Sequence, residues 1–498
     1  MVEQRLLHID GQDVAASDGA TFLVRNPATG EALYDVAHGT AEDVDRAVAA
    51  ARAAFDDGRW RHIAPRERAR TLNRAAVLLA ERIEEYARME TLQIGRPLRE
   101  MRAQLKRLPE WLEYFGAVAQ TTEGSSPDFG AGHLNVVRRV PLGVAGLITP
   151  WNHPLLITMK KLSVAVAAGN SVVIKPSELG PIVPMELVLL LEEAGLPAGV
   201  VNIVPGLGRT TGKALSEHPG LAKLDITGGT ETGKVIAANA GRSLIPVTAE
   251  LGGKAPVLIF DDADTDQAVA GALFAAFVAT GQTCVQGARI LVQRDSYERV
   301  VTALVERTRQ LKLGDPLDSQ TQVGPLVSEA QRDKAADAVE RARKQGATVL
   351  TGGAVPTGAG LSQGWFYEPT VVAGVTPEMD LWYEEVFGPV IVVAPFDDEA
   401  DAVAQANDSP FGLAASIWTQ NVGRAVRVSR GLDIGIVWVN DHHRIDPSSP
   451  WGGFKESGIG SENGLDAFHA YTRPQSLIIN SSDAEFDWFA TVEDLRYS

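Results

Sequence analysis

Cysteine is nearly absent from this sequence, because Cys284 is the only one among 498 residues. A single thiol cannot form an intrachain disulfide, and it cannot supply a cysteine-rich metal site. The N-terminal stretch MVEQRLLHIDGQD contains no visible secretory signal, so we expect a reducing, cytoplasmic location. Most lone cysteines are small buried hydrophobic residues, and Cys284 needs further support before it counts as a reactive group.

Positive charge is also scarce. Lys and Arg number 46 against 63 Asp and Glu, which gives a formal net charge of −17. This balance argues against binding to nucleic acid or to an anionic membrane, because both need a basic surface. Long apolar runs are missing near the key residues: AGALFAAFVA (270–279) is too short to span a bilayer and suits a buried helix. With 45% hydrophobic and 22% charged residues, the chain is typical of a globular protein with two or three domains.

Hydrophobic periodicity predicts helices first, and then two series in which strands alternate with helices. Residues 41–58 and 65–95 place apolar side chains at helical spacing. From Val144 onward, short β-branched runs that end in Pro, Gly or Ser alternate with helical stretches, and a second series follows Gly253. We therefore predict an α/β fold in which a Rossmann-like cofactor domain and a second α/β domain, the catalytic one, are joined near residues 250–256.

Glycine-rich turns after the predicted strands suggest a nucleotide site. Gly208 follows the strand VNIV, and Gly228 and Gly229 follow LAKLDIT. Such glycines let backbone N–H groups approach a phosphate at the N-terminus of the next helix, although many are only turns. In SVVIKPSE, Lys175 and Glu178 stand at the end of a buried strand. There the carboxylate could accept hydrogen bonds from ribose hydroxyls; a solvated pair at the start of a loop is the alternative.

Three further residues suit covalent chemistry at a carbonyl group. Asn152 stands at a strand end in TPWNHP, and its side-chain amide could donate to an oxyanion. Glu250 precedes the Gly-Gly turn of TAELGGK, and Cys284 closes GQTC further along the chain. A thiol nucleophile, a carboxylate base and an amide donor are the set that such a reaction requires.

Six motifs then resemble, in order, those of the aldehyde dehydrogenase superfamily: TPWNHP, IKPSE, ELGGK, GQTC, EEVFGPV and PWGGFKESGIG. The resemblance covers the chain from about residue 5 to 480 and implies NAD-dependent oxidation of an aldehyde to its carboxylic acid. It implies that Cys284 attacks the aldehyde and that the Asn152 side chain and the Cys284 N–H hold the oxyanion. Glu250 would activate the water that hydrolyses the thioester.

The resemblance also implies the cofactor site. Lys175 and Glu178 would bind the adenosine ribose, Glu385 the nicotinamide ribose, and Phe387 would border the nicotinamide. The cofactor-binding residues are therefore Trp151, Lys175, Glu178, Gly208, Gly228, Gly229, Glu385 and Phe387. We expect NAD, because a carboxylate near the ribose 2′-position repels a 2′-phosphate, and NADP stays open because some relatives with this glutamate use both. The family usually has Ser where this chain has Gly229, and Arg where it has Ser461, which leaves cofactor affinity and subunit contacts open.

The substrate pocket is the least determined part of the prediction. The resemblance places it after TPWN, beside Cys284 and in VNDHHRIDPSSPW, with these candidates: His153, Leu156, His443, Arg444 and Trp451. These stretches are polar, with Lys160 and His442 nearby. Three alternatives stay open: loop residues satisfied by neighbours, a cation that selects a carboxylate-bearing aldehyde, or tryptophans that accept an aromatic one. We expect no metal in DHHRID, because adjacent histidines on an extended backbone point to opposite faces.

The resemblance further suggests domain boundaries and assembly. Residues 1–121 and 142–252 would bind NAD, residues 253–465 would form the catalytic domain, and residues 122–141 and 466–498 would form a β arm and C-terminal tail. Strands NVVRRV and PQSLIIN are expected to build an arm that pairs across subunits in a homodimer or homotetramer. The tail aromatics would extend that contact: Phe486, Trp488 and Phe489.

Two other functions compete with hydrolytic aldehyde oxidation. An acylating relative would pass the thioester to coenzyme A, but that branch generally lacks a carboxylate at the position of Glu250. A catalytically silent NAD-binding structural homologue would keep the fold alone, and the presence of Cys284, Glu250 and Asn152 together argues against it.

Overall fold

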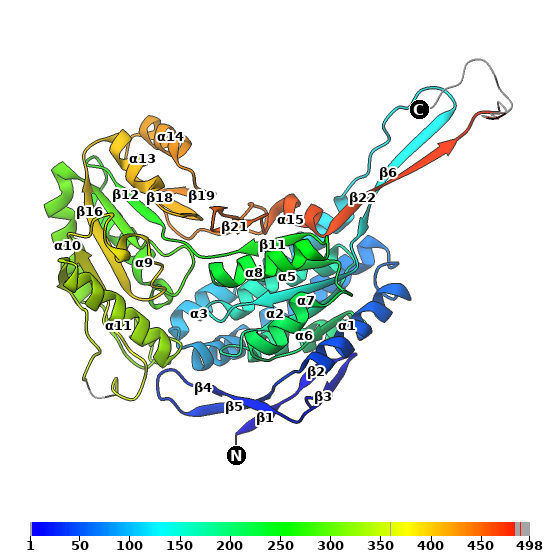
Figure 1. Cartoon of the computed structure of the whole chain (residues 1–498), viewed down its shortest axis with the longest axis horizontal. Helices are drawn as coiled ribbons and strands as arrows, with labels where there is room; N and C mark the ends of the chain where they lie inside the picture. The colour runs from blue at the N-terminus through cyan, green and yellow to red at the C-terminus, as the bar shows by residue number, and fades with distance from the viewer. Residues whose placement is uncertain (1, 359, 484–488, 490–498) are drawn as a thin grey trace.

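Two separate β-sheets organise the chain, and a two-stranded arm extends away from both (Figure 1). The structure is a computed structural model that describes residues 2–358, 360–483 and 489. The predicted tail residues Phe486 and Trp488 lie outside this part, and Phe489 is exposed. None of the helices in the described part is both long and apolar enough to cross a membrane.

The first sheet has eight strands in the order β21-β11-β10-β7-β8-β9-β2-β3. Five central strands run parallel: Val247–Glu250 (β11), Lys223–Thr227 (β10), Val144–Thr149 (β7), Ser171–Pro176 (β8) and Val201–Ile203 (β9). Antiparallel strands close its two edges: Leu7–Ile9 (β2), Gln12–Val14 (β3) and Gly458–Ile459 (β21). The parallel strands are nearly all buried on both faces, which is why they are continuous apolar runs rather than alternating ones.

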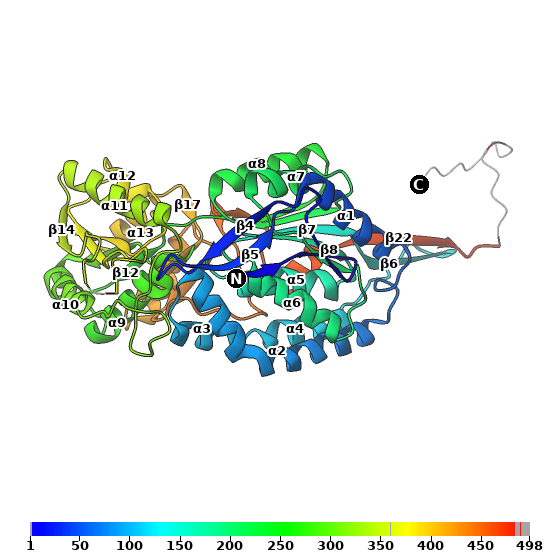
Figure 2. The same ribbon diagram turned by 90° about the horizontal axis from the view of Figure 1, so that it is seen from below.

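Helices cover both faces of this sheet (Figure 2). One face packs against Ala41–Asp56 (α1), Lys213–Glu217 (α7) and Thr230–Arg242 (α8). The other face packs against Pro65–Ile94 (α2), Leu98–Leu105 (α3), Pro109–Thr121 (α4), Pro154–Ala167 (α5) and Ile182–Glu193 (α6). Helix α1 begins with a capping box between Thr40 and Asp43. Helix α2 begins at a proline and ends at Gly95, whose φ of +78° is a left-handed C-cap.

The second sheet has seven strands in the order β14-β15-β16-β13-β12-β18-β19. Their bounds are Thr348–Thr351 (β14), Thr370–Ala373 (β15), Val390–Phe396 (β16), Arg289–Gln293 (β13), Pro256–Ile259 (β12), Ala414–Trp418 (β18) and Ile436–Val439 (β19). Only β14 runs antiparallel to its neighbour within this described sheet. One face carries Thr265–Phe277 (α9) and Tyr297–Arg309 (α10), and the other carries Glu329–Lys344 (α11), Asp380–Tyr383 (α12), Glu399–Asn407 (α13) and Val422–Gly431 (α14).

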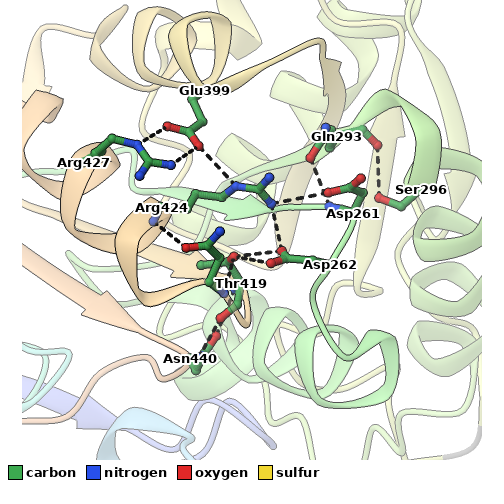
Figure 3. A network of polar contacts seen from close by, with 10 residues as sticks. Asp261, Asp262, Gln293, Ser296, Glu399, Thr419, Arg424, Arg427 and Asn440 are labelled. Carbon is green, nitrogen blue, oxygen red and sulfur yellow. Dashed lines mark hydrogen bonds and ion pairs between the residues drawn. The ribbon is translucent and has the colours of Figure 1, made fainter.

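A charged network ties α13 and α14 to this second sheet (Figure 3). The Arg424 guanidinium on α14 pairs with Asp262 at 2.9 Å and with Asp261 at 3.4 Å, both just after β12. Its Nε pairs with Glu399 on α13 at 3.3 Å, and the guanidinium lies 4.7 Å from the centre of the Phe260 ring. One cation with three carboxylates and an aromatic face fixes three elements at one point.

The arm consists of His133–Pro141 (β6) and Thr472–Asn480 (β22), paired antiparallel along their whole length. It projects from the body (Figure 1) and exposes aliphatic side chains of both strands. The predicted strands NVVRRV and PQSLIIN are therefore confirmed as strands.

The remaining elements are short. A small N-terminal sheet of Glu3–Arg5 (β1), Ala32–Ala37 (β5) and Thr21–Arg25 (β4) was absent from the sequence prediction. Beyond it lie Phe411–Gly412 (β17), Phe454–Lys455 (β20) and Gly464–Ala470 (α15). The predicted α/β class with two sheets is confirmed, and the exact domain boundaries stay predictions.

Candidate active site

The three predicted catalytic residues come from strand ends and loops of both sheets. Glu250 is the last residue of β11, and Asn152 lies in the loop between β7 and α5. Cys284 lies in the loop between the 3-10 turn Val278–Gly281 (η2) and β13. The carboxyl ends of parallel strands are where α/β proteins place their ligands, so this position favours a functional site.

A strained turn presents Cys284. Three consecutive residues before it adopt left-handed backbone angles: Ala279 has a φ of +55°, Thr280 of +56° and Gly281 of +73°. Such angles cost about 1 to 3 kcal/mol at a non-glycine residue, and they cluster at functional sites. Gln286 supports the turn, because its side-chain amide lies beside Gly281 and donates to the carbonyls of Ala276 on α9 at 2.9 Å and of Gly388 at 2.8 Å. The turn ends α9 and directs the chain toward the first sheet.

The Gly-Gly pair after Glu250 allows two close approaches. A Cβ atom on Gly253 would come within 2.3 Å of the Cys284 carbonyl oxygen. A Cβ atom on Gly252 would come within 2.4 Å of the Glu385 carboxylate, and Glu385 accepts the Gly253 N–H at 2.8 Å. The motif ELGGK therefore needs both glycines. Gly253 leaves room for the loop that carries the thiol, and Gly252 leaves room for Glu385, the predicted ribose-binding carboxylate.

Glu250 is a buried carboxylate that makes no hydrogen bond within the part of the chain that the structure describes. Its exposed fraction is 3%, and neither carboxylate oxygen has a hydrogen-bond partner within the described residues. Burial raises the pKa of Glu250 well above its ordinary value, and the nearby Glu462 carboxylate raises it further, while Lys160 and Lys161 oppose the shift. A carboxylate with a raised pKa and free lone pairs can take a proton from a water molecule near neutral pH.

A buried cluster of charges, which the sequence analysis did not assemble, lies close to Glu250. Lys161 on α5 pairs at 2.5 Å with both Asp225 on β10 and Glu462, and Lys160 also pairs with Glu462. Burial alone would raise the pKa of Glu462, but the two lysines lower it to about 2. The Lys160 Nζ lies 4.6 Å from the centre of the Trp451 ring. Two adjacent lysines inside the apolar helix PLLITMKKLSVAVA were the available signal, because buried lysines need acidic partners.

The thiol is protonated in this arrangement. Burial raises the pKa of Cys284 to about 12; Glu250, Glu385 and Glu462 also raise it, and Lys160 lowers it. A thiol with such a pKa is a weak nucleophile at neutral pH until a base takes its proton.

His153 lies beside the nucleophile loop with its proton position defined. Its Nδ1 is 2.7 Å from Arg96 Nη1, and its Nε2 is 3.3 Å from the Thr283 hydroxyl. Because a guanidinium can only donate, Nδ1 accepts and the ring proton is on Nε2. Burial, then Arg96, His443 and Lys160, lowers the pKa of His153 well below its ordinary value. Asn152, the preceding residue, donates its amide to the Gln282 carbonyl at 2.9 Å.

A cavity of about 500 Å³ adjoins His153 and contains three of the predicted pocket residues, Leu156, His443 and Arg444. The pKa of His443 is lowered by burial to about 3, and its ring lies 5.8 Å from His153 and 6.3 Å from Trp451. Arg444 is at the rim, 3.3 Å from Asp441 with its side chain 73% exposed. Sequence reasoning missed several polar residues of the lining: Arg96, Arg99, Gln104 and Arg107.

The adjacent histidines have different surroundings, but the backbone between them is not extended as the sequence analysis assumed: His443 has a left-handed φ of +59°, and the two ring centres lie 6.4 Å apart. His442 points into the core, where its Nε2 donates to the Val285 carbonyl at 2.8 Å. Its Nδ1 lies 3.2 Å from the Ser416 hydroxyl, and burial lowers its pKa to about 4. His442 therefore supports the loop after Cys284. In the described part of the chain, no group of three or more His, Cys, Asp or Glu side chains is placed to hold a metal ion.

The predicted cofactor residues surround open space at the ends of β8 and β10. A Cβ atom on Gly229, at the start of α8, or on Gly208, at the start of the π-turn Gly208–Gly212 (η1), would meet no atom within 4 Å. The buried Thr230 hydroxyl at the same helix start has no hydrogen-bond partner among the described residues. An open helix N-terminus with an unused hydroxyl fits a phosphate. Gly228 donates its own N–H to the Glu250 carbonyl at 3.1 Å, so it supports the turn.

The remaining cofactor candidates are arranged in pairs. Lys175 Nζ lies 3.3 Å from Glu178, and burial lowers the pKa of Lys175. The rings of Trp151 and Phe387 meet edge to face with their centres 5.4 Å apart. Phe387 has a left-handed φ of +58°, and Gln331 on α11 donates to its carbonyl at 2.8 Å. These contacts fix an aromatic pair close to Glu385.

Comparison with known proteins identifies the family. Residues 14–477 match the sequence model of the aldehyde dehydrogenase family. The chain is 41% identical to a betaine aldehyde dehydrogenase of Brucella anthropi over 95% of this chain and 96% of the relative. It is also 41% identical to a phenylacetaldehyde dehydrogenase of Pseudomonas fluorescens over 95% of each chain. A solved structure of a betaine aldehyde dehydrogenase from Staphylococcus aureus in complex with NAD+ superimposes with a TM-score of 0.96, at 37% identity, covering 98% of this chain and 97% of that one.

The chain therefore belongs to the aldehyde dehydrogenase family, whose members are NAD(P)-dependent oxidoreductases. Equal identity to relatives named for chemically different aldehydes means that overall similarity does not assign a substrate.

Proposed function

We propose that this enzyme oxidises an aldehyde to its carboxylic acid with NAD, using Cys284 as nucleophile, Glu250 as base and Asn152 as oxyanion donor. The observation that carries the proposal is the buried Glu250 carboxylate, which has no hydrogen-bond partner among the described residues. Gly253, three residues later, contacts the loop of the only thiol. A carboxylate that is 3% exposed and has only a structural role would accept hydrogen bonds or form an ion pair. A carboxylate that activates water instead needs free lone pairs.

The chemistry of the chain's own residues follows in two stages. A solvent water molecule takes the proton of the Cys284 thiol, and the thiolate sulfur bonds to the aldehyde carbon. The resulting oxyanion accepts from the Asn152 amide and the Cys284 N–H. When bound, NAD supplies the acceptor for the hydride that this carbon loses as the thioester forms. Glu250 then takes a proton from a water molecule, the water oxygen bonds to the thioester carbon, and the C–S bond breaks to release the acid.

The cofactor would lie between the two sheets. Lys175 and Glu178 would hold the adenosine ribose, Gly208, Gly228 and Gly229 the phosphate region beside Trp151, and Glu385 with Phe387 the nicotinamide half. The presence of NAD+ in the similar staphylococcal structure supports this choice, and Glu178 favours NAD over NADP for the electrostatic reason given above. Residues 1–121 and 142–252 would then form the NAD-binding domain, residues 253–465 the catalytic domain, and residues 122–141 and 466–498 the oligomerisation arm and tail. The cytoplasmic location and the homodimer or homotetramer stay predictions.

The pocket favours an aldehyde that is not cationic. Arg96 is 3% exposed and lies at the inner wall beside His153, and Lys160 lies against Trp451. Arg96 pairs with Glu100 and Lys160 with Glu462, but four arginines line the cavity against two acidic residues. A quaternary ammonium group entering there would therefore meet a net positive lining, which repels it. The neutral rings of His153 and His443 and the indole of Trp451 suit either a carboxylate-bearing semialdehyde or an aromatic aldehyde.

A kinetic panel tests this function. NADH formation at 340 nm would be followed with betaine aldehyde, phenylacetaldehyde, an aliphatic aldehyde and an ω-carboxy aldehyde. We expect turnover, with the lowest kcat/KM for betaine aldehyde. Absence of NADH with every aldehyde would favour the silent homologue, and a requirement for coenzyme A would favour the acylating reaction.

A further inference from the structure

A second cavity, of about 690 Å³, lies at the base of the arm and is strongly basic. Five arginines line it, against one acidic residue, Glu123. They are Arg61 from the loop between α1 and α2, Arg68 from α2, Arg138 and Arg139 from β6, and Arg473 from β22. The chain as a whole has a net charge of −17, so a cavity lined by five arginines and one acidic residue differs in sign from the rest of the molecule.

These guanidinium groups have few counter-charges close to them. Within the described residues none of the five forms an ion pair with a carboxylate, although Asp57 is near enough to Arg61 for their charges to interact. Their hydrogen bonds go to neutral acceptors: Arg68 donates to the carbonyls of Ala167 at 3.1 Å and Ile63 at 2.7 Å. Arg139 donates to the Thr472 hydroxyl at 2.6 Å. Neutral acceptors fix the orientation of a guanidinium but leave its full charge in place.

Burial makes this charge costly. Arg68 is only 8% exposed, and its carbonyl partner Ala167 is the last residue of α5, where the helix dipole favours a cation only modestly. The second terminal nitrogen of Arg68, Nη2, makes no hydrogen bond with a described residue. Arg473 makes no side-chain hydrogen bond there either and lines the same cavity. Guanidinium groups with unused donors and no paired carboxylate are the groups that bind carboxylates and phosphates in a bidentate manner.

We infer that this cavity is a binding site for a multivalent oxyanion that joins the base of the arm to the body of the subunit. The ligand would contact β6 and β22 on one side and the start of α2 on the other, so that binding would hold the arm in one orientation. Two sources present the same chemistry: a free polyphosphate or polycarboxylate, and the acidic side chains that follow β22, namely Asp483, Glu485, Asp487, Glu493 and Asp494.

Calorimetry with inorganic pyrophosphate tests the site, using the full chain with saturating NAD so that the cofactor site is filled. The test variant is Arg138→Gln/Arg473→Gln, because both side chains are exposed and neither is part of the active site. We expect saturable binding that is at least tenfold weaker in this variant, because it removes two cationic donors of charge-assisted hydrogen bonds. Arg430→Gln, an exposed arginine on α14, makes the same charge change elsewhere and should bind as the unaltered chain does.

A third protein, in which the five acidic residues after β22 become amides, separates the two sources. Tighter pyrophosphate binding to it than to the unaltered chain would assign the oxyanion to the chain's own acidic residues. Equal binding would assign it to a free ligand. The inference fails if pyrophosphate binds neither protein, or if the two arginine substitutions leave its affinity unchanged. A rise in melting temperature with pyrophosphate that needs Arg138 and Arg473 would independently show that the folded protein binds the ligand through these two side chains.

Discussion

Gly253 and Cys284 touch through the backbone, since a Cβ atom at Gly253 would lie 2.3 Å from the Cys284 carbonyl oxygen. This contact joins two motifs that are far apart in sequence, ELGGK and GQTC. It also explains why the residue three positions after the proposed base has no side chain. The position of the thiol relative to Glu250 therefore depends on residue 253 having no Cβ atom.

Gly253→Ala should therefore displace the nucleophile loop. We expect a loss of kcat of about 100-fold or more, because an error of about 1 Å in the position of a reacting group has that effect. Gly241→Ala is the matched control, since a Cβ atom there would meet nothing within 4 Å. Steady-state kinetics and melting curves of both variants would check this, and an active, well-folded Gly253→Ala protein would contradict it.

Alkylation tests the nucleophile directly, because Cys284 is the only thiol. One equivalent of iodoacetamide should abolish activity, and Cys284→Ser should bind NAD without turnover. Because burial raises the pKa of Cys284 to about 12, the alkylation rate of the free enzyme should rise about tenfold per pH unit from pH 7 to 10. Full activity after stoichiometric alkylation would refute the covalent mechanism, and a plateau near neutral pH would show that the thiolate is stabilised.

Glu250→Gln separates acylation from hydrolysis. If the carboxylate serves only to activate water, a burst of about one NADH per active site should precede very slow turnover. Stopped-flow absorbance at 340 nm measures the amplitude. Loss of the burst would mean that Glu250 also removes the proton of Cys284, a role that the raised pKa of the thiol makes chemically reasonable. Glu231→Gln, an exposed change on α8, should leave both phases intact.

The local elements and motifs could be predicted from the sequence, whereas the contacts between distant elements could not. Strand positions, the α/β class and the three catalytic candidates follow from apolar runs and from motifs that are contiguous in the chain. The partnership of Lys161 with Asp225 and Glu462 could not be predicted, because it joins α5, β10 and a loop through contacts that no local pattern encodes. Arg96 was missed for the same reason: its contact with His153 at 2.7 Å depends on how α3 packs beside α5.

Glu90 offers a test of pH-dependent stability near the active site. One of its oxygens accepts the Leu155 N–H at 2.8 Å at the start of α5, and the other has no partner within the described residues. Burial raises its pKa from 4.5 to about 7. A folded-state pKa above the unfolded value means that stability is full below about pH 4.5 and is lost as the pH rises through about 7.

Glu90→Gln keeps the acceptor for Leu155 but cannot ionise. Relative to the unaltered protein, its free energy of unfolding should therefore increase between pH 5 and pH 8, by up to about 3 kcal/mol. Denaturant titrations at the two pH values measure the difference. Glu85→Gln, exposed on the same helix, should show no such trend, and a pH-independent effect of Glu90→Gln would contradict the assignment.

The arm exposes aliphatic side chains that a second subunit would cover. Its two strands expose Leu134 at 47%, Leu477 at 50%, Ile478 at 54% and Ile479 at 41%, and an isolated two-stranded ribbon is only marginally stable in water. A second subunit that covers these side chains and the open strand edges would remove both costs. We therefore expect a homodimer or homotetramer by light scattering at micromolar concentration.

Two variants and a truncation test this role of the arm. Ile478→Arg should shift the assembly toward smaller species without unfolding the subunit. Val422→Arg, a similar change at an exposed position on α14, should leave the assembly unchanged. Truncation after Ser482 should lower the melting temperature or change the assembly, because it removes three aromatic residues that follow β22 in the sequence, Phe486, Trp488 and Phe489. A 53 kDa monomer of the untruncated chain would rule out this role for the arm.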